Sequence, residues 1–199
     1  MLRIESTGRS GLLKSILSLA AFSLALSAAV PEGWIMSGSR PADYQSAVDS
    51  QVVYNGRPSA YLRYASPNGP GGGGFGTLMQ SFGANDYIGQ RVRFSGFVKS
   101  EAVQNWAGLW MRVDFATKTL SFDNMQNRPI KGTTEWQLYE VVLDVPEGST
   151  RIALGILMSG KGAVWLNSPR FEIVSNSVPL TGRPALPIPD GPTNLSFDK

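Results

Sequence analysis

Residues 105–115 read NWAGLWMRVDF, and their alternation predicts how the middle of the chain folds. Successive side chains of a β-strand point to opposite faces, so one face of this segment would be purely apolar, with Ala107, Leu109, Met111 and Val113. The other face would hold two indoles and two charges, from Trp106, Trp110, Arg112 and Asp114. The first face suits a protein core, and the second is unusual for the outside of a strand.

The polar face of this segment suggests a binding surface. Aromatic rings beside hydrogen-bonding groups hold ligands that have apolar faces and polar edges, such as a sugar ring. In the alternative interpretation, both tryptophans are buried and the two charges pair with neighbouring side chains. The exposure of Trp106 and Trp110 in the folded protein distinguishes the two.

The beginning of the chain has the layout of a secretory signal peptide. Arg3, Arg9 and Lys14 precede an apolar run at residues 16–26, and small residues follow at 27–29. We expect residues 1–29 to be removed and the protein to be secreted or periplasmic, without membrane contact after cleavage. An uncleaved signal anchor is the alternative, although the run is short for a membrane span.

The charge balance gives little support for a nucleic-acid partner. The whole chain has 18 basic and 15 acidic residues, and the leader holds three of the former and one of the latter. The remainder therefore has 15 basic and 14 acidic residues, a net charge of +1.

Cysteine and histidine are both absent from the sequence. Their absence excludes disulfides, thiolate nucleophiles, the Ser-His-Asp triad and most zinc or copper sites. Catalysis would need carboxylates, Lys, Tyr or Arg, and the sequence has no close cluster of carboxylates like those that glycosidases pair. We expect no catalytic residue, no metal ligand and no cofactor.

Two glycine motifs resemble nucleotide-binding loops but stand in the wrong context. Residues 71–76 fit G-x-G-x-x-G, yet a predicted strand follows where a helix would have to open. Residues 155–161 fit G-x-x-x-x-G-K, yet Gly162 occupies the place of the required Ser or Thr. Both motifs are interpreted as turns or loops.

Ten segments of alternating polarity, separated by Gly, Pro, Asn or Asp, predict ten β-strands. They cover residues 33–37, 44–48, 59–65, 76–82, 90–99, 106–115, 119–125, 136–145, 151–158 and 163–174. One helical turn is expected near residues 85–88. Short strands at this spacing predict an all-β fold, an antiparallel sandwich or barrel.

The C-terminal residues 175–199 differ in composition from the rest of the chain. They hold five of the 13 prolines and show no strand pattern. This composition predicts either an extended, partly polyproline-like tail or a tether packed along the domain. Such a tail is also a candidate contact for a protein partner in the cell envelope.

Other polar residues extend the candidate site beyond the first segment. Asp123 and Asn124 open a polar run at a predicted strand end, and Gln80 stands in an otherwise apolar strand. Such planar groups bind ligand hydroxyls or satisfy the backbone of a turn. The predicted ligand site therefore comprises Trp106, Trp110, Arg112, Asp114, Asp123, Asn124 and Gln80.

The order of several segments resembles the galactose-binding-type jelly rolls of carbohydrate-binding modules, including the CenC-like family. The matching segments are GW at 33–34, LMQSF at 78–82, GQRVRFSGFVK at 89–99, WQLY at 136–139, VP at 145–146 and VWLN at 164–167. The resemblance implies an antiparallel β-sandwich with a jelly-roll topology. Such modules often end in an Asp-Asp pair associated with a structural calcium ion. Asn167-Ser168 stands here instead, so no cofactor is expected, and a structural calcium ion is kept as an alternative only because of the resemblance.

A closer resemblance is to an uncharacterised bacterial domain family whose members have nearly the same sequence in several segments. The shared segments are GLWMRVD at 108–114, FDNM at 122–125, RPI at 128–130, GT at 132–133 and VVLDVP at 141–146. Its members are often labelled transcriptional regulators because the domain is attached to a helix-turn-helix. This sequence shows no such pattern and has the leader in its place, so the regulator label is not expected to apply. The resemblance implies a ligand-sensing or ligand-binding role, without identifying the ligand.

Together these observations predict an exported sandwich over residues 32–174, followed by the proline-rich tail. The expected function is non-catalytic binding of a carbohydrate or a similar small polar ligand. One alternative is a cell-envelope accessory domain or ligand-sensing domain that contacts another protein. A glycan-processing enzyme based on carboxylates is a further alternative.

Overall fold

The computed structural model describes residues 29–66, 69, 73–184, 191 and 195–196. The expected leader, residues 1–29, lies outside this part of the chain except for Ala29. Among the residues just given, no helix is both long and apolar enough to cross a membrane.

Strands account for nearly all of the regular structure, which confirms the predicted all-β class. In chain order they are β1 (Ile35–Gly38), β2 (Tyr44–Tyr54), β3 (Arg57–Tyr64), β4 (Phe75–Gly83), β5 (Arg91–Phe115), β6 (Lys118–Asp123), β7 (Ile130–Asp144), β8 (Arg151–Ser159), β9 (Ala163–Val174) and β10 (Arg183–Pro184). Two short 3₁₀ helices, η1 (Pro41–Asp43) and η2 (Asn85–Tyr87), complete the described elements. The predicted helical turn near residues 85–88 corresponds to η2, whereas η1 was not predicted.

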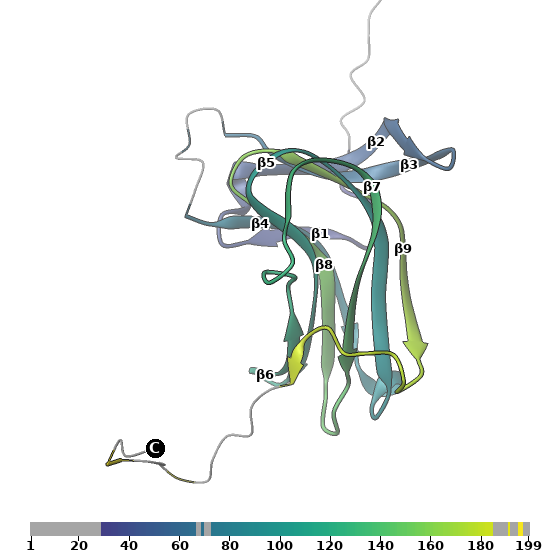
Figure 1. The fold of residues 1–199 in the computed structure, drawn as a ribbon, viewed down its shortest axis with the longest axis vertical. Helices are drawn as coiled ribbons and strands as arrows, with labels where there is room; N and C mark the ends of the chain where they lie inside the picture. The colour runs from purple at the N-terminus through teal and green to yellow at the C-terminus, as the bar shows by residue number, and fades with distance from the viewer. Residues whose placement is uncertain (1–28, 67–68, 70–72, 185–190, 192–194, 197–199) are drawn as a thin grey trace, which may run out of the picture.

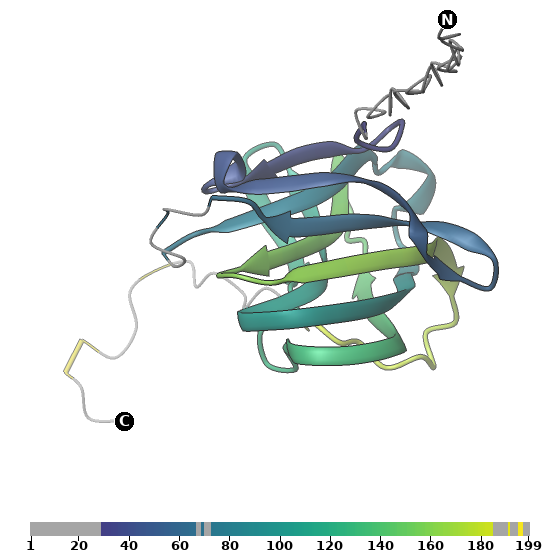
Figure 2. The same ribbon diagram turned by 90° about the horizontal axis from the view of Figure 1, so that it is seen from above.

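The strands form one antiparallel sheet that curls into two layers (Figure 1). The first layer has the order β1-β4-β8-β5-β6-β10, and the second has the order β2-β3-β9-β5-β7. Figure 2 shows the strands of the second layer side by side, from the blue β2–β3 hairpin to the green β7. The β-sandwich expected from the sequence is therefore present.

Strand β5 connects the two layers because its two halves pair with different neighbours. Residues 91–101 pair with β9, and residues 106–114 pair with β8. Two separate strands, 90–99 and 106–115, were predicted here, and that prediction was wrong. The polar residues between them break the alternation, but pairing with β7 continues through register shifts, and Ala102 takes a left-handed backbone conformation with φ 49°.

The core lies between the layers and is built by the predicted alternation. Leu109, Met111 and Val113 of β5 are fully buried there, together with Ile152 and Ile156 of β8. Each such side chain contributes about 1.5–3 kcal/mol to folding through burial. The intervening residues of the same strands point away from the core, and they form the outer face of the first layer.

Residues 175–184, here called the strap, pack against the domain. Arg91 donates from Nη1 to the carbonyl oxygens of Asn176 and Val178, each at 2.7 Å. The backbone N–H of Thr181 donates to the carbonyl of Val142 at 3.1 Å. The strap ends in β10, which pairs with β6 and is drawn in yellow beside it in Figure 1. For these residues the structure favours the packed tether, and it adds a short strand that was not predicted.

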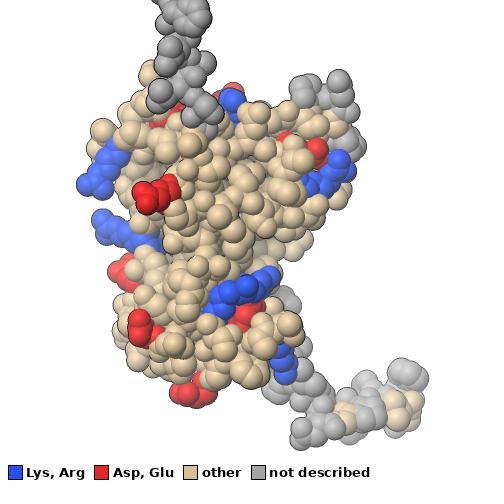
Figure 3. Space-filling view, turned by 180° about the vertical axis from the view of Figure 1, so that it is seen from behind, with Lys and Arg blue, Asp and Glu red and all other residues tan. Residues whose placement is uncertain are grey.

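Charged side chains are spread over the surface in both signs. On the side shown in Figure 3, blue and red groups are interspersed between wide uncharged areas. This distribution agrees with the nearly even balance of basic and acidic residues in the sequence.

Candidate functional site

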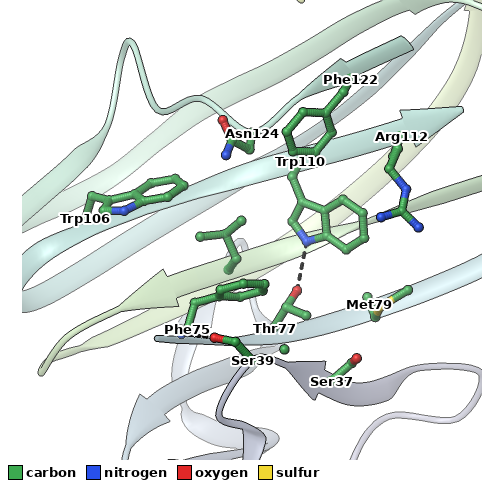
Figure 4. A pocket seen from close by; sticks show the side chains of 12 residues that line it. Ser37, Ser39, Phe75, Thr77, Met79, Trp106, Trp110, Arg112, Phe122 and Asn124 are labelled. Atoms are coloured by element: carbon green, nitrogen blue, oxygen red, sulfur yellow. Dashed lines mark hydrogen bonds between the residues drawn. The ribbon is translucent and has the colours of Figure 1, made fainter. Parts of the chain in front are cut away.

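A hollow of about 570 Å³ lies on the outer face of the first layer (Figure 4). Strands β4, β5, β6 and β8 contribute to it, together with the chain around the end of β1. Its lining residues are Ser37, Gly38, Ser39, Phe75, Thr77, Met79, Trp106, Trp110, Arg112, Phe122, Asn124 and Leu157. Four of the seven predicted ligand contacts are among them, namely Trp106, Trp110, Arg112 and Asn124.

The floor of the hollow is an apolar cluster separate from the main core. Trp110 packs there with Ala153 and Leu157 of β8, and Met79 and Trp106 lie against them. Gly155 is the register partner of Trp110 on β8. A Cβ atom on this glycine would lie 2.3 Å from the carbonyl oxygen of Leu78, so its absence allows β4 to approach.

Trp110 is part of this floor and is not an exposed platform. Its exposed fraction is 7%, and its Nε1–H donates to Oγ1 of Thr77 at 2.8 Å. Thr77 in turn donates to the carbonyl of Ile156 at 2.9 Å. The indole N–H is therefore not available to a ligand, and for this residue the interpretation as a buried tryptophan is correct.

The accessible aromatic rings of the hollow come from three other residues. Trp106 is half-buried, while Phe75 and Phe122 are 37% and 42% exposed. Figure 4 shows the rings of Trp106 and Phe75 on one side of the hollow and that of Phe122 across from Trp106. Sequence reasoning missed both phenylalanines. The alternation of β4, which places Phe75 on the face of Thr77 and Met79, was the available signal.

Arg112 reaches the hollow, but Asp114 does not line it. The Asp114 side chain is 4% exposed and accepts from Nε of Arg112 and Nη2 of Arg151, each at 3.0 Å. Thr119 donates to it at 3.2 Å. The predicted ligand contact through Asp114 is therefore replaced by a buried carboxylate that anchors two arginines.

Asp123 is likewise buried and stabilises the chain beside the hollow without lining it. Its carboxylate, with the side chain 5% exposed, forms a bidentate pair with Arg128, whose Nη1 and Nη2 lie 3.1 and 2.6 Å from the two oxygens. It also accepts from the backbone N–H of Met125 at 2.8 Å. This pairing holds the turn after β6, so that Asn124 faces the hollow while Asp123 itself is covered.

Gln80 lies away from the hollow, contrary to the prediction. It belongs to the opposite face of β4 and lines a smaller cavity of about 160 Å³ beside Trp34 and Phe171. No three acidic side chains gather into a metal-binding group in the part of the chain that the structure describes.

The sequence is similar to a curated protein, and no family model matches it. The relative is named an uncharacterised HTH-type transcriptional regulator, YbfP, of Bacillus subtilis strain 168. It is 46% identical over 173 residues, which are 84% of this chain and 57% of the relative. The chain thus spans less than two thirds of that protein, and the finding agrees with the resemblance to regulator-labelled bacterial domains.

Solved structures with the same fold include several carbohydrate-binding modules. The CBM22-1 xylan-binding domain of Xyn10C from Paenibacillus barcinonensis matches with a TM-score of 0.50 and 21% identity, over 71% of this chain and 86% of that one. The CBM22-1–CBM22-2 tandem of the same protein gives 0.52 and 18%, over 74% and 43%.

A third match is the enzymatically active domain of tailspike protein 4 from bacteriophage CBA120, with a TM-score of 0.53 and 13% identity, over 72% of this chain and 20% of that one. At these identities the likeness concerns the fold. The chain therefore has the jelly-roll fold found in carbohydrate-binding modules, and its sequence is similar to part of a bacterial protein named as a transcriptional regulator.

Proposed function

We propose that this domain binds a carbohydrate in the hollow of its first layer without catalysing a reaction. The observation that carries the proposal is the combination of accessible rings and polar groups around one hollow. Trp106, Phe75 and Phe122 offer apolar faces, and Arg112 and Asn124 offer hydrogen-bond donors beside them. The volume of about 570 Å³ lies within the range usual for small-molecule sites.

The binding energy would come mainly from stacking on Trp106. A pyranose presents a face of C–H groups that packs on an indole, while its hydroxyl groups bond to donors at the edge. The side-chain amide oxygen of Asn124 accepts from the backbone N–H of Gln126 at 3.2 Å. The NH₂ group of Asn124 is therefore the part of this side chain that remains as a donor for a ligand hydroxyl. Stacking with a few hydrogen bonds corresponds to dissociation constants on the order of micromolar to millimolar.

The state of the carboxylates supports binding in preference to hydrolysis. Glycosidases need two carboxyl groups that face the substrate across a short distance. Asp114 and Asp123 are instead covered and held by arginines. Arg112 is the single ionisable residue among those that line the hollow.

Export to the periplasm or the medium is part of the proposal and is supported by the leader pattern at residues 1–29. Expression of the full chain in a bacterial host should yield a secreted or periplasmic product that begins at Val30. Mass spectrometry of the product would identify its first residue. A product retained in the membrane with residues 1–29 intact would favour the signal anchor instead.

The test of carbohydrate binding is a glycan titration by calorimetry, followed in parallel by tryptophan fluorescence. Replacing Trp106 by Ala should weaken binding about tenfold, since stacking of this kind contributes about 0.5–1.5 kcal/mol beyond area burial. The matched control is Trp136→Ala, because Trp136 is also a half-buried tryptophan but packs on Tyr54 of the second layer. Equal affinities for the two variants, or no response to a broad glycan panel, would contradict the proposal.

A second candidate is a ligand-sensing domain, and the relative named as a regulator favours it. In that case the same hollow would bind an effector, and occupancy would alter contacts with another protein. Co-purification from a bacterial host with and without the bound sugar separates the two functions. A partner that is captured only in one of the two conditions indicates sensing.

A further inference from the structure

The one cation of the hollow has a partner on only one of its nitrogens. Nε of Arg112 donates to the carboxylate of Asp114 at 3.0 Å, and the side chain remains 38% exposed. Within the described residues, no group bonds to its two terminal nitrogens. Figure 4 shows the guanidinium group at the edge of the hollow, near Met79. Asp114 thus orients the guanidinium group through Nε, and the two terminal nitrogens remain available to a ligand in the hollow.

The carboxylate that pairs with Arg112 does not fully neutralise its positive charge. Asp114 supplies one negative charge and is shared by two guanidinium groups, those of Arg112 and Arg151. The cluster therefore carries a net positive charge of one unit. No acidic residue lines the hollow, and the largest part of the lining is aromatic or aliphatic. The apolar part of the lining lowers the local dielectric constant beside the guanidinium group and so strengthens an ion pair, whereas the 38% exposure of the side chain screens the pair in part.

We propose that the ligand carries a carboxylate, and specifically that the sugar is a uronic acid; this inference rests on the proposed carbohydrate binding. The two terminal nitrogens of an arginine match the two oxygens of a carboxylate in a bidentate pair. The hydroxyl groups of a neutral sugar need only neutral donors, which Asn124 and Ser39 already offer. In a uronate on Trp106, the ring supplies the stacking face and the carboxylate fills the open side of Arg112.

The experiment compares oligosaccharides that differ only at the carboxyl group. Oligomers of galacturonic, glucuronic and mannuronic acid are each titrated beside their carboxyl-reduced, neutral counterparts. The acid forms should bind about 10- to 100-fold more tightly, as expected for a charge-assisted bidentate contact. Arg112→Gln should abolish this preference, because it weakens the binding of the acid forms far more than that of the neutral forms, and Arg112→Lys should retain part of the preference. Arg93→Gln is the control, since Arg93 pairs with Glu140 and Glu172 on the second layer.

Each outcome separates this inference from the function on which it rests. Equal affinity for acid and neutral forms, with binding still dependent on Trp106, overturns the carboxylate preference and leaves carbohydrate binding intact. If cyclohexanecarboxylate binds as tightly as the uronates through Arg112, the carboxylate site is supported and the carbohydrate assignment is contradicted. If no compound binds to a folded protein, as judged by circular dichroism, both proposals fail. If Arg112→Gln does not fold, Arg112→Lys is compared with the unmodified protein. A reduced preference for the acid forms then supports the proposal, and an unchanged preference contradicts it.

Discussion

Trp110 connects three strands beneath the hollow. Its ring belongs to β5, its N–H bonds to Thr77 on β4, and Thr77 bonds to the carbonyl of Ile156 on β8, which lies between them. A buried indole N–H without a partner would be costly, so this arrangement makes Thr77 a structural requirement of Trp110. Two successive hydrogen bonds, from Trp110 to Thr77 and from Thr77 to Ile156, therefore hold the floor of the hollow in place across three strands.

Replacing Trp110 by Phe should reduce the free energy of unfolding by about 1 kcal/mol from the lost hydrogen bond, with further loss from the smaller ring. Thr77→Val removes the other partner of the same bond. Urea unfolding of both single variants and of the double variant measures the coupling between them. A coupling energy of about 1 kcal/mol is expected for one shared hydrogen bond. If the two effects simply add, the bond contributes nothing to stability.

At the scale of single strands, alternation in the sequence predicted most of what the structure contains. The two faces of β5 were assigned correctly, because the side-chain period of a strand is a local property. The continuity of β5 was not predictable in this way, since it depends on pairing with β7 through several register shifts. The roles of Asp114 and Asp123 also required tertiary information. Asp114 meets Arg151, which lies 37 positions further along the chain.

Strand β2 contains an irregularity that Asp49 stabilises. The register against β3 shifts between Asp49 and Val53, which leaves backbone groups outside the regular ladder. Oδ1 of Asp49 accepts from the N–H groups of Gln51 and Val52, and Oδ2 accepts from Nε1 of Trp165 at 2.9 Å. Partial burial raises the pKa of Asp49, but these hydrogen bonds outweigh it and hold the pKa below its ordinary value of 3.8.

This lowered pKa predicts how stability depends on acid. Because the folded protein favours the ionised form, Asp49 stabilises the fold above the ordinary pKa, and this contribution is lost as the pH falls through the lower folded value. The stability difference between the unmodified protein and Asp49→Asn should therefore shrink below about pH 4. Urea unfolding from pH 3 to pH 6 measures it, and the indole N–H resonance of Trp165 should shift over the same range. A difference that does not change with pH contradicts the assignment.

At the scale of the whole molecule, the strap places β10 at the edge of the first layer, next to the strand that carries Phe122. Arg183 of β10 is the register partner of Phe122, and Phe122 lines the hollow from β6. Thr181 is bonded to Val142 through both its backbone and its hydroxyl group. The strap therefore holds β6 and β7 together, and residues 175–184 pack against the sandwich that was predicted for residues 32–174.

Two truncations test this role of the strap. A chain that ends after Val174 loses the bonds of Thr181, the two carbonyl contacts of Arg91 and the β10 pairing. Each hydrogen bond contributes about 0.5–1.5 kcal/mol, and ordering the strap offsets a large part of the sum, so we expect a loss of roughly 1–3 kcal/mol. A chain that ends after Pro184 keeps all of these contacts and should unfold at a higher urea concentration than the chain that ends after Val174. Because Phe122 depends on the strap and Trp106 does not, the shorter chain should also bind the ligand more weakly while its response to Trp106→Ala is retained. Equal stability of the two truncated chains would mean that residues 175–184 contribute nothing to the fold, and they would then be free to contact a partner protein.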